Sequence, residues 1–171
     1  MDKADIRKLI IEKRKNNYER LKQAETKIIE ALSKDLEFLN STYIGIYYPM
    51  YIEINLLNLI NLYPDKVFGF PKIIGHDMIF VSYDKTKGFN IGPYQIHEPI
   101  SDLDVSDKIE YYLVPSLASY KNYRLGFGKG YYDRYFNKYN QGIKVGVHLE
   151  DEIIEFTPSN LDIPLDKFLM G

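Results

Sequence analysis

The segment from Arg124 to Asp133 reads Arg-Leu-Gly-Phe-Gly-Lys-Gly-Tyr-Tyr-Asp and combines residue types that can bind phosphate. Its three glycines alternate with other residues: Gly126, Gly128 and Gly130. Glycines let backbone N–H groups approach an anion closely, and the helix expected to follow adds positive potential. Arg124 and Lys129 would supply full charges on an exposed loop. The spacing matches neither G-x-x-x-x-G-K-[ST] nor G-x-G-x-x-G, so the pattern alone fits a phosphate site or a flexible strand-to-helix connection equally well.

Asp133 lies where this helix would begin, and its carboxylate has two interpretations. It can simply interact with the helix dipole. It can also bind Mg²⁺, which takes one or two carboxylates together with substrate phosphates. The neighbouring aromatic residues, among them Tyr131 and Tyr132, have helical spacing that is more typical of core packing than of ligand stacking.

Lys3, Arg7 and Arg14 form a cationic stripe near the start of the chain. At 100° per residue they lie within about 40° of one another on one side of a helix. The stripe borders the apolar residues Ile6 and Ile10, so these charges could lie against the body of the protein. A solvated face on an exposed helix is the more common arrangement for such a stripe.

The segment from Tyr48 to Glu53 follows the first expected strand, where ligands bind in open α/β sheets. Glu53 is a lone carboxylate between two isoleucines, and it could equally be an exposed acid on a loop. The three histidines, His76, His97 and His148, are far apart in sequence. Without a paired ligand spacing, none of them is assigned to a metal site.

The elements that must position these residues follow from the hydrophobic pattern. Two amphipathic helices come first, with a break at Asn16-Asn17, and further helices are expected over residues 56–63 and 129–139. Strands are expected over residues 43–48, 66–74, 78–83, 111–114, 143–148 and near 168. This alternation predicts a single-domain layered α/β fold over residues 1–171, with a mainly parallel central sheet flanked by helices and preceded by the two amino-terminal helices.

The composition excludes several classes of protein. With 45% hydrophobic and 27% charged residues in 171, the chain is an ordinary globular one. A net charge of −2 argues against binding of nucleic acid or of an anionic membrane surface. The absence of Cys excludes disulfides, thiolate metal sites and Cys nucleophiles. With no apolar span or signal peptide evident, we expect a cytoplasmic protein.

Taken together, these segments resemble the 5-formyltetrahydrofolate cyclo-ligase family, also called methenyltetrahydrofolate synthetases, over almost the whole chain. The most specific match is residues 124–133, which are similar to the family signature R-L-G-x-G-x-G-Y-Y-D in full. The other matches, in order, are Lys3-x-x-x-Arg7 with Arg14, residues 47–53, Gln95-Ile-His-Glu98-Pro99, Leu113-Val-Pro115 and Asp162-Ile-Pro-Leu-Asp166. Ser116 stands where the family has Gly, and residues 119–123 match poorly, which affects the shape of the folate pocket.

The resemblance implies an ATP- and Mg²⁺-dependent ligase that closes 5-formyltetrahydrofolate to 5,10-methenyltetrahydrofolate and releases ADP and phosphate. It implies catalytic roles for Arg124, Lys129 and Tyr132. The ATP-binding residues would be Lys3, Arg7, Arg124, Gly126, Gly128, Lys129, Gly130, Tyr131 and Tyr132, to which the helical geometry adds Arg14. The folate-binding residues would be Tyr48, Glu53, Gly128 and Tyr132. Asp133 and Asp162 would bind Mg²⁺.

Two other classes of function remain as alternatives. One is a non-enzymatic α/β module in which the basic helix and the glycine loop bind RNA or a phosphorylated partner; the net charge counts against it. The other is an isomerase of phosphorylated sugars, which rests on fold analogy alone. For the ligase we expect small-molecule partners only, without nucleic acid or membrane, and a monomer or a weak homodimer.

Overall fold

The computed structural model describes residues 1–171 and begins with the two expected helices, α1 (Lys3–Lys15) and α2 (Tyr18–Leu32). The side chain of Asp2 accepts a hydrogen bond from the backbone N–H of Asp5 and so caps α1. Helix α2 buries one face, composed of Leu21, Ala24, Ile28 and Leu32. This spacing places the four side chains on one stripe, and the sequence prediction of two amphipathic helices is confirmed.

A six-stranded sheet forms the centre of the molecule. Its strands, in spatial order, are β10 (Lys167–Met170), β9 (Ile143–His148), β6 (Tyr111–Pro115), β1 (Tyr43–Gly45), β2 (Val67–Ile74) and β3 (Asp77–Ser82). All neighbours pair in parallel except β2 and β3, which are antiparallel and joined by a turn at Gly75, where φ is 65°. The predicted mainly parallel sheet is therefore confirmed.

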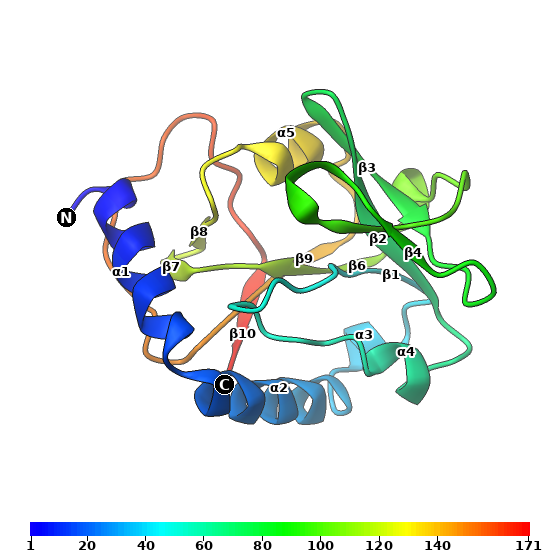
Figure 1. Ribbon diagram of the computed structural model, residues 1–171, viewed down its shortest axis with the longest axis horizontal. Helices are drawn as coiled ribbons and strands as arrows, with labels where there is room; N and C mark the ends of the chain where they lie inside the picture. Colours follow the sequence, from blue (N-terminus) through cyan, green and yellow to red (C-terminus); the bar gives the residue numbers. More distant parts are fainter.

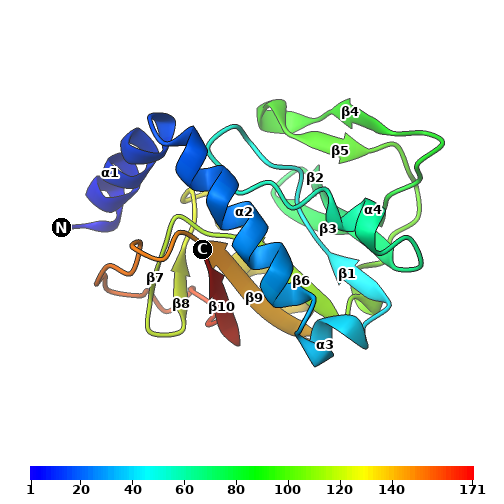
Figure 2. The same cartoon turned by 90° about the horizontal axis from the view of Figure 1, so that it is seen from below.

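Helices cover both faces of this sheet, with α2 on one side and α5 (Tyr131–Lys138) on the other (Figure 1). Figure 2 shows α2 lying across the sheet. Alternate residues of the strands enter the two cores: Tyr111 packs on the α2 side, whereas Tyr112 packs with Tyr135 and Phe136 of α5. The strands are thus buried on both faces, which explains their nearly continuous apolar runs.

A third, smaller core joins α1 to a hairpin outside the main sheet. The hairpin consists of β7 (Ala118–Tyr120) and β8 (Tyr123–Leu125). Ile6 and Ile10 of α1 pack there against Leu125 and Phe156. Because this packing buries the apolar stripe of α1, it also turns the bordering cationic side chains toward the protein.

Several elements differ from the sequence-based expectations. The strand expected over residues 43–48 ends at Gly45, and the helix expected over 56–63 is the short α4 (Leu59–Leu62). Helix α5 begins at Tyr131, after Gly130, whose φ of 74° lies outside the helical region. The elements not predicted are α3 (Leu36–Leu39), the β7–β8 hairpin, the hairpin of β4 (Phe89–Ile91) with β5 (His97–Pro99), and 3₁₀ turns at Pro93–Gln95 and Ser106–Lys108.

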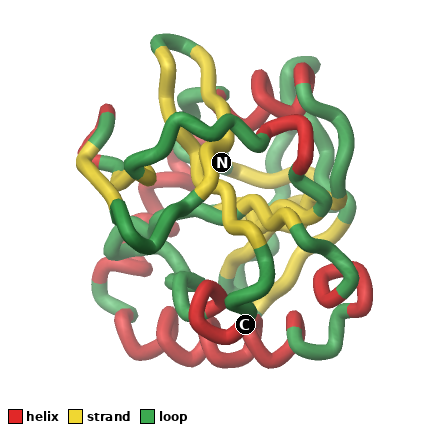
Figure 3. The backbone as a smooth tube through the Cα atoms, turned by 90° about the vertical axis from the view of Figure 1, so that its right-hand side faces the viewer, coloured by secondary structure: helices red, strands yellow, loops and turns green.

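The two chain ends lie at different helices. Gly171 lies against Ala24 of α2, and its N–H donates to the carbonyl of His148. Figure 3 shows the carboxyl terminus beside a helix at the edge of the strands. None of the helices combines the length and the apolar character that crossing a membrane requires.

Candidate functional site

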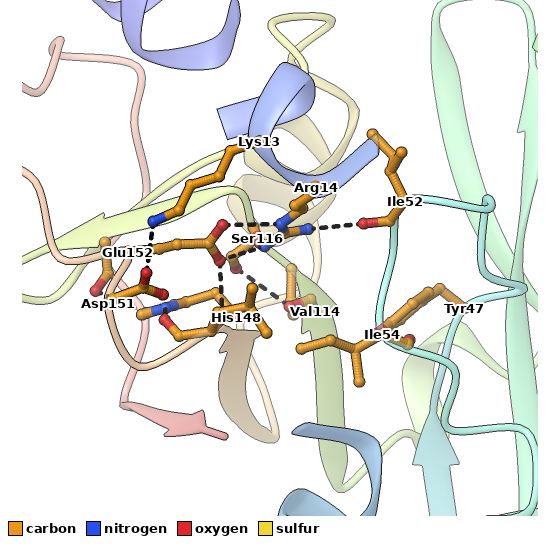
Figure 4. A network of polar contacts seen from close by, with 12 residues as sticks. Lys13, Arg14, Tyr47, Ile52, Ile54, Val114, Ser116, His148, Asp151 and Glu152 are labelled. Atoms are coloured by element: carbon orange, nitrogen blue, oxygen red, sulfur yellow. Dashed lines mark hydrogen bonds and ion pairs between the residues drawn. The ribbon is translucent and has the colours of Figure 1, made fainter. Parts of the chain in front are cut away.

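The carboxyl ends of the parallel strands β1, β6 and β9 open into loops that meet at Arg14 of α1 (Figure 4). The Arg14 guanidinium donates to the carbonyl of Ile52 in the loop after β1 and to that of Ser116 after β6. It also pairs with Glu152 after β9, at 2.7 Å and 2.9 Å. These loops carry most of the predicted site residues, so the site lies at the sheet edge where ligands are expected.

Arg14 itself does not have the role that we expected. It is only 3% exposed, and Glu152 is fully buried. A buried ion pair with further hydrogen bonds to both partners is a structural connection between elements. The expectation that Arg14 contacts nucleotide is therefore wrong, because its donors are already occupied by the loops that it joins. Glu152 was not predicted, because nothing in the sequence distinguishes it from neighbouring acids.

Lys3 and Arg7 lie on the same side of α1 and face the glycine loop, residues 126–130. Arg7 donates through Nε to the carbonyl of Gly126 at 2.7 Å, while its two terminal nitrogens donate to no protein atom. The Lys3 ammonium contacts Asp162 at 2.5 Å. A solvated face, the alternative suggested by the sequence, is thus wrong for these side chains.

Two of the three glycines in the glycine loop have backbone conformations that favour glycine, and the third lies against a guanidinium group. Gly128 and Gly130 have φ values of 90° and 74°, which favour glycine. A Cβ at Gly126 would lie 2.3 Å from a terminal nitrogen of Arg124, and one at Gly128 would lie 3.2 Å from Cζ of Arg7. Two guanidinium groups therefore lie against this backbone, so the loop combines positive charge with glycine backbone.

Arg124 belongs to β8 and is partly buried, so the expectation of an exposed loop residue was wrong. Its Nε and one terminal nitrogen donate to the carbonyl of Pro115 at the end of β6. Its guanidinium also lies 5.0 Å from the ring centre of Tyr132.

Lys129, in contrast, is exposed as expected, with its ammonium 5.0 Å from the ring centre of Tyr94. Tyr131 contacts the same Tyr94, with a distance of 3.4 Å between the two hydroxyl oxygens.

Glu53 is 9% exposed, so the alternative of an exposed acid is also wrong. Its Oε1 accepts a hydrogen bond from the N–H of Met50 at 2.8 Å. Burial raises the pKa of Glu53 from 4.5 to about 7, although the Met50 N–H and the charges of Arg14 and Arg124 act in the opposite direction. Burial likewise raises the pKa of the Tyr132 hydroxyl. A carboxyl group with a pKa near neutral pH thus lies in the same region as Arg124 and Tyr132.

Tyr48 lies against the β4–β5 hairpin. Its ring stacks on His97 with 4.2 Å between centroids and an interplanar angle of 14°, and it meets Phe89 edge-on at 5.0 Å. The sequence predicts no strand between residues 83 and 111, so this stack was not expected. The alternation of Phe89 and Ile91 is the one signal that could have indicated a strand there.

Asp133 lies in the first turn of α5 and contacts the loop before β10, which carries Asp162. Asp133 accepts through Oδ1 from the N–H of Ile163, the residue after Asp162. Oδ2 of Asp162 accepts from Lys3 and from the N–H of Ser159. Although partial burial favours the neutral acid, these hydrogen bonds hold the pKa of Asp162 below its ordinary value. Oδ2 of Asp133 accepts no hydrogen bond from the protein, and the two carboxylates lie near each other, which fits Mg²⁺ with its preference for one or two protein carboxylates. No three His, Asp or Glu side chains gather around a common point.

Comparisons with known proteins show the family to which this chain is similar. The model of the 5-formyltetrahydrofolate cyclo-ligase family matches residues 1–171. A probable 5-formyltetrahydrofolate cyclo-ligase of Schizosaccharomyces pombe is 33% identical over 113 residues, which are 56% of this chain and 53% of that protein. The aligned segment therefore spans about half the length of that relative.

Two solved structures are similar over nearly the whole chain. The NMR structure of 5,10-methenyltetrahydrofolate synthetase from Aquifex aeolicus has a TM-score of 0.85 and 31% identity, with 99% of this chain and 90% of that chain covered. The structure of a 5,10-methenyltetrahydrofolate synthetase from Mycoplasma pneumoniae has a TM-score of 0.78 and 25% identity, with 99% and 98% covered.

Proposed function

The chain belongs to the 5-formyltetrahydrofolate cyclo-ligase family, and we propose that it converts 5-formyltetrahydrofolate to 5,10-methenyltetrahydrofolate with hydrolysis of ATP to ADP and phosphate. The observation that carries this proposal is the position of Arg7. Its terminal nitrogens donate to no protein atom and lie beside Gly128, whose φ of 90° favours glycine. A guanidinium fork next to such a loop suits a phosphate group.

On the nucleotide side, Lys3, Arg7, Arg124 and Lys129 provide positive charge around the glycine loop. Arg7 and Lys129 have donors that bind no protein atom, and one terminal nitrogen of Arg124 is also unpaired. Gly126, Gly128, Gly130, Tyr131 and Tyr132 contribute backbone and ring surface to the same side. These groups would hold ATP and neutralise the charge that develops on the transferred phosphoryl group.

On the folate side, Tyr48 and Glu53 would contact the substrate, together with Gly128 and Tyr132. Glu53 presents a carboxyl group in a mostly dry environment, where a hydrogen bond to a ligand N–H is stronger than in water. The Arg124 guanidinium lies 5.0 Å from the Tyr132 ring centre, and the charges of Arg124 and Glu53 both act on the pKa of the Tyr132 hydroxyl. The folate and the phosphates would thus meet at Tyr132 and Arg124.

The reaction needs the formyl oxygen to become a leaving group. Transfer of the γ-phosphoryl group to that oxygen makes an imidate phosphate; N10 then attacks the formyl carbon and loses its proton, and the carbon–oxygen bond breaks with release of phosphate. Positioning and charge neutralisation supply most of the catalysis in such a transfer. We assign these tasks to Arg124, Lys129 and Tyr132, which lie where the two substrates would meet.

Asp133 and Asp162 are the residues that would hold Mg²⁺. When bound, the ion would neutralise phosphate charge and orient the oxygens of ATP. Lys3, which pairs with Asp162, would keep that carboxylate oriented next to the nucleotide. Only one or two protein carboxylates are needed, since substrate phosphates and water supply the remaining ligands.

The direct test mixes the protein with Mg-ATP and 5-formyltetrahydrofolate and follows the absorbance of methenyltetrahydrofolate. We expect product only when ATP is present, together with one ADP per product. Absence of product from folded protein at saturating substrates would refute the proposed activity. ATP hydrolysis that does not depend on folate would favour a different reaction.

A matched pair of variants on α1 tests the nucleotide side. Arg7→Gln removes the free guanidinium, and we expect KM for ATP to rise roughly 10- to 150-fold, the effect of losing one hydrogen bond between charged groups. Lys8→Gln changes an exposed neighbour on the same helix and should leave KM unaltered. Equal KM values in both variants would contradict a phosphate contact at Arg7.

A further inference from the structure

The β4–β5 hairpin is fixed to the sheet by a buried carboxylate. Oε2 of Glu98, which is 6% exposed, accepts a hydrogen bond from the N–H of Ile73 in β2 at 2.8 Å. Gly92 covers this carboxylate so closely that a Cβ there would lie 2.5 Å from Oε1. The hairpin register, with Asn90 opposite Glu98 and Ile91 opposite His97, is therefore locked. His97 consequently has a defined place relative to the rest of the fold.

Two residues of this hairpin hold Tyr48 from different sides. Phe89 and His97 point to the same face of the hairpin, because Phe89 pairs with Pro99 and Ile91 with His97. Phe89 meets Tyr48 edge-on, whereas the His97 ring covers the Tyr48 ring in a nearly parallel stack. Both Tyr48 and His97 are half-buried, so the pair keeps surface that a ligand can reach.

We propose that His97 is a positioning residue for substrate recognition, which stacks on Tyr48 and holds that ring as a preformed wall of the folate site. This inference rests on the proposed function, since it assigns Tyr48 to the folate. The backbone of Tyr48 lies outside the sheet, after the end of β1, so the sheet does not fix its ring. Tyr48 packs at the margin of the main core and against Phe89, and the one ring that stacks on its face is His97.

Such a restraint on Tyr48 should strengthen the binding of folate. A side chain that is already ordered loses little rotamer freedom when a ligand binds, whereas a free one must be ordered at that moment. An aromatic pair of this geometry accounts for a factor of about 2 to 12 in an equilibrium constant. Loss of the stack should therefore raise KM for folate by that factor, while kcat and KM for ATP stay unchanged.

The experiment compares His97→Ala, His97→Phe and His76→Ala in steady-state turnover, with folate and ATP varied separately. His97→Ala should raise KM for 5-formyltetrahydrofolate, and His97→Phe, which keeps a flat ring on Tyr48, should restore it. His76 lies exposed in the turn between β2 and β3, so His76→Ala is the matched control and should behave as wild type. The midpoint of thermal unfolding is measured for each variant.

Two outcomes would overturn the proposal for His97. One is an unchanged KM for folate in a folded His97→Ala variant. The other is a loss of thermal stability with equal changes in both KM values, which a purely structural role would produce. Failure of the proposed function is a separate result, because the wild-type protein would then form no methenyltetrahydrofolate at all.

Discussion

Replacement of Glu53 by Gln should stabilise the free protein at alkaline pH. The carboxyl group is almost completely buried, and burial raises its pKa from 4.5 to about 7. The native state therefore keeps the proton to a higher pH than the unfolded chain does. The stabilisation by this group is complete below the unfolded pKa and is lost as the pH rises through the folded pKa.

The magnitude follows from the shift of the pKa. Each unit corresponds to about 1.4 kcal/mol, so ionisation of Glu53 lowers the free energy of unfolding by about 2.5 kcal/mol between pH 5 and pH 8. Gln keeps the size of the side chain and an oxygen that can accept from the Met50 N–H, but it does not ionise. The variant should lack this pH-dependent loss.

Urea unfolding at pH 5 and pH 8 measures the effect. The quantity compared is the urea midpoint of Glu53→Gln minus that of wild type. This difference should be about 1 M larger at pH 8 than at pH 5, for an m-value near 2 kcal/mol/M. Glu155→Gln, at an exposed acid, is the control for a general change of charge. A difference between Glu53→Gln and wild type that is the same at both pH values would refute the argument from burial.

Three further predictions concern other parts of the site. Arg14→Met should lower the free energy of unfolding by about 3 to 5 kcal/mol because it leaves the Glu152 carboxylate buried without its partner; Arg14→Met combined with Glu152→Leu should recover much of this loss in urea unfolding. Arg124→Ala should raise KM for ATP roughly 10- to 150-fold; an unchanged KM would exclude a phosphate contact. Asp133→Asn and Asp162→Asn should raise the Mg²⁺ concentration needed for half-maximal activity with folding intact, and a wild-type Mg²⁺ titration in both would remove the metal site.

The sequence predicted what depends on local pattern and missed what depends on distant partners. The sheet strands and the two first helices were predictable because their apolar residues recur with the period of the element. The glycine loop was recognisable because three alternate glycines stand next to Arg124 and Lys129 in the sequence. Lys3 and Arg7 could be placed on one helix face, but their burial depended on the docking of that face near Gly126 and Asp162, far away in the sequence.

Arg14 shows this limit most clearly. In a helix it has the same spacing and charge as its neighbours in the stripe, so periodicity could not separate it from Arg7. Its role depends on Glu152, which is 138 residues away. The burial of Arg124, which was expected to be exposed, and that of Glu53, for which an exposed acid was the alternative, depend on loops that the hydrophobic pattern does not describe.

The contacts of α1 also have a consequence for the order in which the protein folds. The Lys3–Asp162 and Arg14–Glu152 pairs close loops of 159 and 138 residues, nearly the whole chain. Such long-range contacts form slowly, since their loop-closure entropy must be overcome before they stabilise anything. During synthesis on the ribosome, α1 cannot form these two ion pairs until Glu152 and Asp162 have left the ribosome. The strands that precede Glu152 in the chain, β1, β2, β3, β6 and β9, can thus pair before α1 docks, whereas β10 emerges only after both carboxylates.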